Sequence, residues 1–237
     1  MDFQLKGVNF LYQKWWTREG AILADEMGLG KTVQIITFLS LLNTDRGARP
    51  FLVAVPNSTI GNWAREFERW APEMRVVTYG GDKTSRSIVE RYELFAGQSL
   101  KTQVVLATYE ALEKNIAVFR RVPRWDTLVV DEGQRLKGGS RGLLYKALDT
   151  LRIGHRVLLS GTPLNNSVGE VFNLLRFVDP RARETLNDIE GRTTELTQSA
   201  IEEVRTCLQK YMLRRTKETV LNLPSLVCVH QVADTVD

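Results

Sequence analysis

The sequence predicts an α/β domain in which a mostly parallel sheet is covered by helices on both faces. Short runs of β-branched residues alternate with longer segments of helical period over residues 1–178. Most of these runs are apolar throughout, which is typical of strands that are buried on both faces. Because alternating strands and helices build parallel sheets through right-handed crossovers, we expect residues 1–178 to form one domain.

Twelve segments carry this alternation, and each shows the period of its element. In residues 60–70, for example, Trp63, Phe67 and Trp70 recur at helical spacing. The strands are expected at residues 21–24, 51–55, 75–78, 104–107, 128–130 and 156–159. The helices are expected at residues 33–42, 60–70, 86–95, 109–119, 143–151 and 168–177.

The character of the chain changes after Asp179-Pro180, and we expect residues 179–237 to form a helical extension. Residues 181–199 are polar and poor in apolar side chains, which indicates a surface excursion. A helix is predicted over residues 200–213, and residues 226–232 are a possible strand.

The composition excludes several classes of protein. The 237 residues are 43% hydrophobic and 25% charged, unlike a disordered or fibrous chain. Apolar runs are far shorter than the roughly 18 residues that cross a bilayer, so no membrane partner is expected. Two cysteines cannot build a disulfide framework, and no Cys/His cluster has zinc-ligand spacing. The net charge of +4 permits a nucleic-acid partner without requiring one.

A phosphate-binding loop is predicted where the first strand runs into a helix, in GAILADEMGLGKTVQIITF at residues 20–38. Gly28 and Gly30 allow backbone N–H groups to turn toward phosphate oxygens, and the helix N-terminus adds its positive dipole end. Lys31 would reach the terminal phosphates of a nucleotide, and the Thr32 hydroxyl would bind Mg²⁺.

This loop departs from the strict pattern at one position, because Asp25 stands where the pattern has glycine. The alternative interpretation is an ordinary glycine-rich turn between a strand and a helix. The strand-to-helix context and the Lys-Thr pair favour the phosphate loop.

An acidic motif, TLVVDEGQRLK at residues 127–137, places two carboxylates at the end of another predicted strand. Asp131 would hold Mg²⁺, in part through water, and Glu132 would orient or deprotonate the attacking water. An acidic pair is common in turns, but its combination with Lys31-Thr32 favours a nucleotide site, since open parallel sheets bind ligands beyond the carboxyl ends of their strands.

A third motif is LLSGTPLNN at residues 158–166. Ser160, Gly161 and Thr162 follow a strand and are candidates for sensing the γ-phosphate or contacting the acidic motif. A plain Ser-Gly-Thr-Pro turn is an equally open interpretation.

Together these motifs resemble those of the Swi/Snf-type chromatin-remodelling ATPases, a branch of the superfamily-two helicase-like motors. The string ILADEMGLGKT at residues 22–32 is similar to that family's motif I almost residue for residue. Residues 58–86 are most similar to the chromodomain-helicase (CHD) class. Further similar strings are FQLKGVNFL, SGTPLNN and MLRRTKETVLNLP, at residues 3–11, 160–166 and 212–224.

The resemblance implies the first RecA-like lobe of a nuclear motor that uses ATP and Mg²⁺ to move along double-stranded DNA and to remodel nucleosomes. Gln4 would read adenine. Ser58-Thr59 and Thr108-Tyr109 would face the DNA backbone, although helix caps and turns explain them equally well. The nucleotide-contacting residues would be Gln4, Asp25, Glu26, Met27, Gly28, Leu29, Gly30, Lys31 and Thr32.

Two departures from the family bear on turnover. Gln134 stands where most relatives carry histidine, and it can hydrogen-bond without protonating, so coupling to Ser160-Gly161-Thr162 is open. A second lobe, which would supply arginines worth about 10³–10⁵ in rate, is expected beyond this chain. We therefore expect Mg-ATP binding with poor turnover. The alternatives are a pseudo-motor scaffold, or a Swi/Snf-type translocase of DNA repair or transcription.

Overall fold

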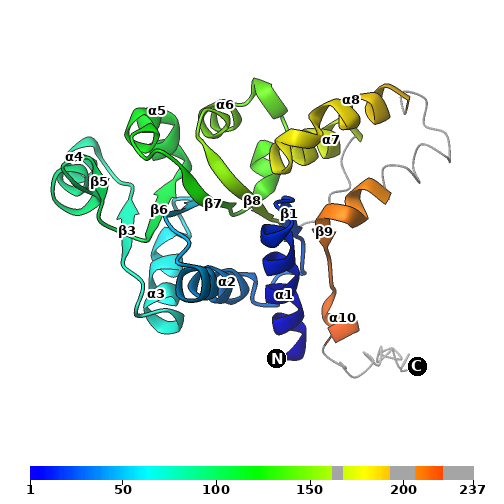
Figure 1. Ribbon diagram of the computed structural model, residues 1–237, viewed down its shortest axis with the longest axis horizontal. Coiled ribbons are helices and arrows are strands. Elements are labelled where there is room, and N and C mark those ends of the chain that lie inside the picture. The colour runs from blue at the N-terminus through cyan, green and yellow to red at the C-terminus, as the bar shows by residue number, and fades with distance from the viewer. Residues whose placement is uncertain (162–167, 193–205, 221–237) are drawn as a thin grey trace, which may run out of the picture.

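A seven-stranded sheet, with strands in the order β3-β6-β2-β7-β8-β1-β9, forms the middle layer of the fold (Figure 1). The computed structural model describes residues 1–161, 168–192 and 206–220. All strand pairs in this sheet are parallel. The strands are β1 (Ala21–Leu23), β2 (Phe51–Val55), β3 (Val76–Tyr79), β6 (Val104–Thr108), β7 (Trp125–Val130), β8 (Ile153–Leu159) and β9 (Met212–Leu213).

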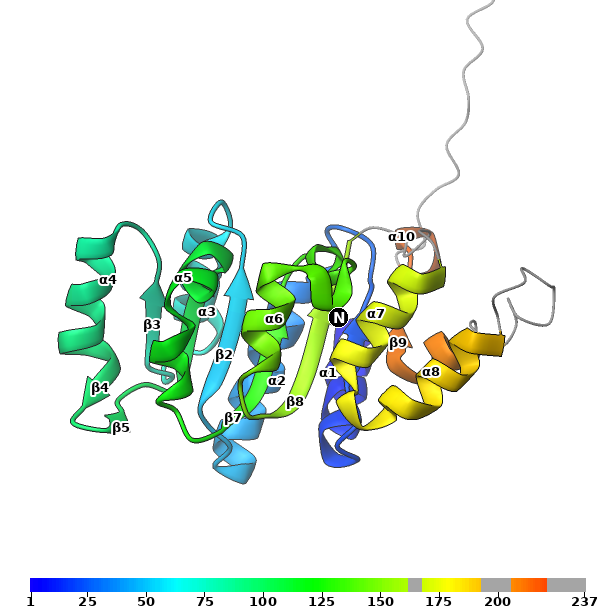
Figure 2. The ribbon, with the colours of Figure 1, turned by 90° about the horizontal axis from the view of Figure 1, so that it is seen from above.

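Helices cover both faces of the sheet, as Figure 2 shows from above. One face carries α1 (Asp2–Trp16), α2 (Lys31–Arg46) and α3 (Ile60–Trp70). The other carries α5 (Tyr109–Arg120), α6 (Leu143–Asp149), α7 (Val168–Val178) and α8 (Arg183–Arg192). At the β3 end lie α4 (Lys83–Val89), a π-helical turn (Glu90–Leu94) and a small hairpin of β4 (Phe95–Ala96) and β5 (Ser99–Leu100).

The alternation of side chains along each strand divides the core into two clusters. Phe51, Val53 and Val55 pack on the α2 and α3 face, whereas Leu52 and Ala54 pack on the α5 and α6 face. All five are 0% exposed. A strand that is covered on both faces must be apolar at every position, which is why these runs show no alternation. The six expected strands and the mostly parallel sheet are thereby confirmed.

Helices α1 and α8 were missed by the sequence patterns, as was the single turn of α10 (Lys217–Val220). Helix α1 buries only Gly7, Val8 and Leu11 of its fifteen residues. Helix α8 lies within the segment expected as a polar excursion, and Leu186 is its only side chain among the fully buried core residues of the described chain. A single buried stripe of one to three side chains anchors a helix without producing a clear apolar period.

The expected helix over residues 200–213 is wrong at its carboxyl end. Residues 206–211 are helical, but Met212–Leu213 form β9, which pairs with Ile22 and Leu23 of β1. A two-residue strand carries no periodicity of its own, so only its partner identifies it. The expected strand at residues 226–232 lies outside the described residues, and the division at residue 178 stays a prediction.

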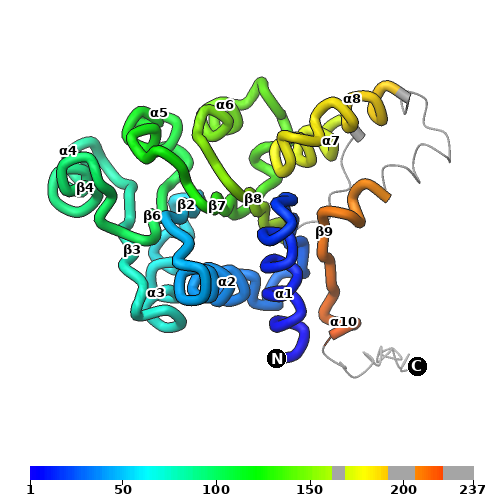
Figure 3. The backbone as a smooth tube through the Cα atoms, viewed as in Figure 1, coloured from blue at the N-terminus to red at the C-terminus, as the bar shows by residue number. Residues whose placement is uncertain are grey.

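The segment that contains β9 runs beside the start of the chain. In Figure 3 it passes α1 and continues to α10 (Lys217–Val220), near the N-terminus. This path places residues 212–220 against both α1 and the loop that follows β1, about two hundred residues earlier in the sequence.

Candidate functional site

The predicted site residues follow strands that all point the same way, so the sheet gathers them at one edge. The loops after β1, β7 and β8 carry the glycine loop, Asp131-Glu132 and Ser160-Gly161, respectively. The loop after β2 carries Ser58-Thr59, and Thr108-Tyr109 lie at the junction where β6 ends and α5 begins. The carboxyl edge of a parallel sheet is where open α/β folds bind their ligands.

The glycine loop has the backbone that its sequence predicts. Gly28 and Gly30 have φ of 90° and 76°, in the left-handed region that favours glycine. A Cβ at Gly30 would lie 2.5 Å from Nε2 of Gln4, so the Gln4 side chain of α1 lies directly against this position. Helix α2 begins at Lys31, directly after Gly30, and therefore points its unpaired N–H groups into the loop.

Lys31 is folded over this loop. Its Nζ donates a hydrogen bond of 2.8 Å to the backbone carbonyl of Asp25. Burial lowers the pKa of Lys31, while the charges of Asp25, Asp131 and Glu132 act in the opposite direction. The ammonium thus lies within electrostatic reach of the acidic motif, and it has only a neutral carbonyl as its hydrogen-bond partner among the described residues.

The other loop residues divide by exposure. Leu29 is buried, and its carbonyl accepts hydrogen bonds from Gln34 at 3.3 Å and from Gln4 at 3.5 Å. Met27 is 68% exposed. Thr32 lies in the first turn of α2, and its hydroxyl makes no hydrogen bond within the described part of the chain. It is thus free to bind a ligand.

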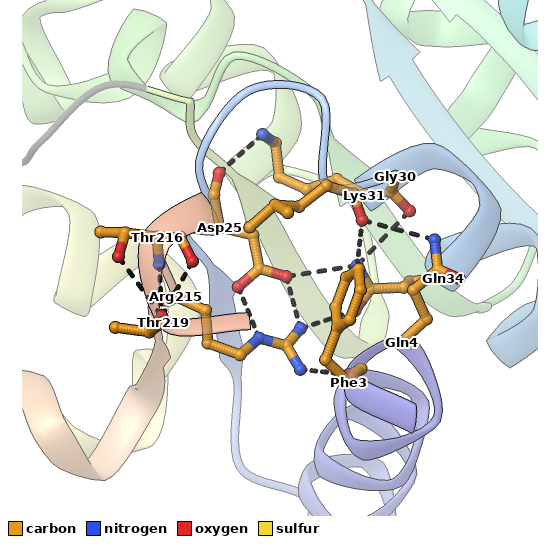
Figure 4. Close-up of polar contacts among 10 residues, drawn as sticks. Phe3, Gln4, Asp25, Gly30, Lys31, Gln34, Arg215, Thr216 and Thr219 are labelled. Carbon is orange, nitrogen blue, oxygen red and sulfur yellow. Dashed lines mark hydrogen bonds and ion pairs between the residues drawn. The ribbon is translucent and has the colours of Figure 1, made fainter. Parts of the chain in front are cut away.

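Asp25 does not point its carboxylate into the loop. The side chain is completely buried and forms a two-point ion pair with Arg215, in which Nε donates to Oδ1 at 2.9 Å and Nη2 donates to Oδ2 (Figure 4). Gln34 donates to Oδ2 at 3.2 Å. Asp25 therefore meets the loop through its backbone carbonyl, which holds Lys31.

Arg215 is the residue that sequence reasoning missed. Besides Asp25, its guanidinium donates to Oε1 of Gln34 at 2.9 Å and to the carbonyl of Phe3. One side chain thereby joins β1, α1 and α2 beneath the loop (Figure 4). Its partner Asp25 is 190 positions away, so no local pattern could have identified the pair. Two signals were present: the Asp at a position that the strict loop pattern reserves for glycine, and the family-like string at residues 212–224 that contains Arg215.

Backbone hydrogen bonds reinforce this connection. The N–H of Ala24 donates to the carbonyl of Leu213 at 2.8 Å, and that of Glu26 donates to the carbonyl of Arg215 at 2.9 Å. The Glu26 carboxylate accepts from the N–H of Lys217 at 2.7 Å. The segment after β9 therefore holds the chain that leads into the phosphate loop.

Asp131 is held at the end of β7 by two donors. Trp63 Nε1 donates to Oδ2 at 2.9 Å, and the N–H of Glu132 donates to Oδ1 at 3.0 Å. Burial raises the pKa of Asp131, and these hydrogen bonds act against that shift. Trp63 is a buried residue of α3, and its hydrogen bond orients the Asp131 carboxylate, which is the predicted ligand of Mg²⁺.

Glu132 has a backbone that is unusual for its residue type. Its φ is 47°, a left-handed conformation in which non-glycine residues carry strain. Gln134 Nε2 donates to its Oε2 at 2.5 Å, and Tyr109 donates its hydroxyl proton to the carbonyl of Asp131. Strain of this kind gathers at functional sites, and here the neighbours fix the carboxylate in place.

The third motif meets the loop as well. Ser160 is 2% exposed, and its N–H donates to the carbonyl of Leu23 at 3.1 Å. A Cβ at Gly161 would lie 3.6 Å from Nζ of Lys31. Thr162 lies outside the described residues.

The four residues expected to face DNA differ in their exposure. Ser58 is exposed, and Thr59 is the N-cap of α3. Thr108 and Tyr109 are 3% and 5% exposed, and the Thr108 hydroxyl caps α5 by accepting from Ala111 N–H at 3.2 Å. The hydroxyls of Thr108 and Tyr109 are thus engaged inside the domain.

Comparison with known proteins identifies the family. The profile of the SNF2-related domain matches residues 3–233. The chain belongs to the SNF2-related domain family. This SNF2-related chain is 40% identical over 231 residues to chromatin remodeling factor mit1 of Schizosaccharomyces pombe, covering 96% of the chain and 16% of mit1. It is 40% identical over 230 residues to chromodomain-helicase-DNA-binding protein 1 of Gallus gallus, covering 95% of the chain and 13% of that relative.

The fold agrees with a solved member of the SNF2 group. The SWI2/SNF2 ATPase core of Sulfolobus solfataricus, solved in complex with dsDNA, superposes with a TM-score of 0.78 at 28% identity. The match covers 94% of this SNF2-related chain and 46% of the archaeal chain. The expected α/β lobe and the resemblance to Swi/Snf-type and CHD-class proteins are confirmed. No helix in the described ranges is long and apolar enough to cross a membrane.

The Trp63–Asp131 hydrogen bond leads to a first prediction. In Trp63→Phe the ring remains apolar but the indole donor is lost, so the pKa of Asp131 should rise further. Leaving its oxygen without this donor should also lower the free energy of unfolding by about 1–3 kcal/mol. Carboxyl-carbon NMR titration and thermal unfolding measure both. Trp70→Phe is the matched control, because Trp70 is half exposed and donates to Glu66 on its own helix. An unchanged Asp131 titration would contradict the assigned role.

Proposed function

We propose that this chain is the nucleotide-binding first lobe of a DNA-dependent ATPase that remodels nucleosomes. The observation that supports it most is the convergence of three charged groups at one edge of the sheet. Lys31 lies over the glycine loop, and Asp131 and Glu132 act on its pKa from the end of β7. One ammonium group beside two carboxylates suits a bound nucleoside triphosphate with its metal ion.

Each residue then has a chemical role. The N–H groups after Gly28 and Gly30, together with Lys31, hold the phosphates, and Gln4 reads the adenine. Thr32 and Asp131 hold Mg²⁺, which would neutralise charge on the phosphates when bound. The fit of the metal rests on a free Thr32 hydroxyl at the start of α2 and on the buried, oriented Asp131 carboxylate. Glu132 orients the attacking water and accepts its proton.

Partners are proposed from the relatives and from the same edge of the sheet. The archaeal core was solved with dsDNA, and mit1 is a chromatin remodeling factor. We therefore propose contacts of Ser58-Thr59 and the Thr108-Tyr109 backbone with the DNA phosphates, nucleosomes as the substrate, and a nuclear location.

Turnover is proposed to need a second lobe. The chain spans only 13–16% of the two curated relatives and 46% of the archaeal core. An arginine supplied from a second lobe would be worth about 10³–10⁵ in rate, so the 237-residue chain alone should bind Mg-ATP and hydrolyse it poorly.

A pseudo-motor is the second candidate. It is favoured by the 2.5 Å hydrogen bond in which Gln134, in place of the usual histidine, holds the Glu132 carboxylate. DNA-stimulated ATP hydrolysis by the two-lobe protein would exclude it. A related translocase acting in DNA repair or transcription remains a third candidate, and the domains that flank the motor in the longer protein would distinguish it from a remodeller.

Titration with a fluorescent ATP analogue and Mg²⁺ tests the nucleotide site directly. We expect saturable binding that weakens at least about 100-fold in Lys31→Ala, because two charge-assisted hydrogen bonds of about 1.5–3 kcal/mol each are lost. Lys114→Ala, at an exposed position of α5, is the charge-matched control and should bind normally. Equal binding by Lys31→Ala and the unmodified chain would overturn the phosphate-loop assignment.

A further inference from the structure

Two adjoining cavities open at the edge of the sheet opposite the nucleotide loop. Their volumes are about 580 Å³ and about 370 Å³, and they share Arg18, Arg124, Gly154 and His155 as lining residues. Gly154 and His155 lie at the start of β8, and Arg124 directly precedes β7. In Figure 2 these strand starts lie at the end of the sheet away from the loop before α2. The cavities are therefore separate from the site of Lys31.

The lining of these cavities is strongly positive. Asp126 and Asp179 are the acidic residues among the described lining, and both are engaged. Asp126 accepts from Trp15 Nε1 at 2.9 Å, and Asp179 pairs with Arg181 at 3.3 Å. Against these two acids stand six arginines: Arg18, Arg49, Arg124, Arg152, Arg156 and Arg181.

Four of these arginines have no partner. The side chains of Arg18, Arg49, Arg124 and Arg152 form no ion pair or hydrogen bond with any residue that the structure describes. Six arginines against two aspartates give the lining a formal excess of +4, which equals the formal charge of the whole chain. Clustered guanidinium groups repel one another, and a bound anion is the usual compensation.

A buried polar ring lies between the two cavities. His155 is 4% exposed and lines both of them, and neither ring nitrogen forms a hydrogen bond with a described residue. Burial lowers the pKa of His155 to about 3, so the ring is neutral at pH 7. The Glu19 backbone offsets part of this shift without meeting the geometry of a full hydrogen bond. A neutral imidazole has one N–H to donate to an anion.

Backbone features shape the same place. A Cβ at Gly154 would lie 2.6 Å from Nη2 of Arg124 and 2.8 Å from the carbonyl of Asp126. Glycine there lets the guanidinium lie against the start of β8, at the wall of both cavities. Arg18 has a φ of 57°, a left-handed conformation that non-glycine residues seldom adopt. The arginines are thus placed by specific backbone geometry.

We propose that this arginine-lined pair of cavities binds a compact anion that carries several phosphate groups. Guanidinium forks match phosphate oxygens in two-point hydrogen bonds, and four unpaired charges exceed what a single carboxylate could balance. The volumes lie within the range of small-molecule sites. The four unpaired arginines are exposed and surround two cavities of limited volume, so a compact free polyphosphate fits them better than an extended nucleic-acid backbone does. The site does not depend on the proposed ATPase function.

Calorimetric titration with inorganic tripolyphosphate tests this site. The titration uses Lys31→Ala, so that the phosphate loop does not contribute. One saturable site is expected, and Arg124→Gln or Arg152→Gln should each weaken it about tenfold or more through the loss of charge-assisted hydrogen bonds. Arg124 and Arg152 are both exposed, so neither substitution removes a buried side chain, and the two variants test the site independently. Arg65→Gln, an equal charge change at an exposed position of α3, should leave the affinity unchanged.

Three results would overturn the proposal. The first is the absence of tripolyphosphate binding by Lys31→Ala when thermal unfolding shows that it is folded. The second is an equal loss in Arg65→Gln, which would indicate nonspecific charge attraction. The third is binding of a polyglutamate peptide or of duplex DNA that depends on Arg124 and Arg152 while tripolyphosphate does not bind. A failure of ATP binding by the unmodified chain would concern Lys31 alone and would leave this test unaffected.

Discussion

Replacing Arg215 with methionine should lower the free energy of unfolding by about 3–5 kcal/mol, because it leaves the Asp25 carboxylate buried without its cation. Asp25 is 0% exposed, and Arg215 is only 12% exposed at its side chain. The substitution should also weaken ATP binding, since the Asp25 backbone carries the carbonyl that positions Lys31. We therefore expect Arg215 to act as a positioning residue for the proposed nucleotide site, from the segment that follows β9.

Chemical denaturation and nucleotide titration together test this role. Arg214→Met is the matched control, because the neighbouring Arg214 is exposed and has no hydrogen bond or ion pair with the described residues. The double variant Asp25→Leu with Arg215→Met should regain much of the stability, since it removes both charges. Recovered stability with weak ATP binding would show that the pair positions the loop. A stability loss in Arg215→Met no larger than in Arg214→Met would refute the buried ion pair.

Replacing Glu132 with glutamine should reduce ATP hydrolysis by the two-lobe protein about 10²–10⁴-fold while ATP binding is kept. Glutamine has nearly the shape of glutamate but cannot accept the proton of the attacking water. Its amide oxygen can still accept the hydrogen bond from Gln134, so the strained turn at φ 47° should keep its geometry. The loss should therefore appear in kcat with little change in the affinity for ATP.

Single-turnover hydrolysis and nucleotide titration of the same preparation separate the two effects. Glu113→Gln, an exposed position of α5, is the control and should hydrolyse ATP normally. Retained hydrolysis in Glu132→Gln would remove Glu132 from the role of base. Lost binding would indicate instead that the carboxylate supports the loop structurally.

Local patterns predicted the elements whose burial is regular, either along the whole strand or along one face of the helix. Strand β2 is buried along its whole length between β6 and β7, so its residues could only be apolar. Helix α3 carries Trp63 and Phe67 on one buried face, and the predicted bounds agree with the structure. The glycine loop was predicted because its left-handed backbone at Gly28 and Gly30 requires particular residues at nearby positions.

The elements that were missed depend on partners that lie far away in the sequence. Helix α1 is held by a narrow stripe, and β9 is a strand only because Ile22 and Leu23 lie beside it. The Tyr109 hydroxyl donates to the carbonyl of Asp131, which lies 22 positions further along the chain. None of these partners is visible in a window of ten or twenty residues.

The sequence by itself determined the α/β class and the strand positions, and it predicted the proposed roles of Lys31, Asp131 and Glu132, because these follow from burial and from motifs of adjacent residues. Only the tertiary structure decided that Asp25 faces Arg215 instead of the loop, and that arginines from four separate loops share one pair of cavities. The physical reason is the parallel sheet. It brings the ends of all strands to two edges, so groups far apart along the chain meet there, and their pairing depends on the register of the sheet.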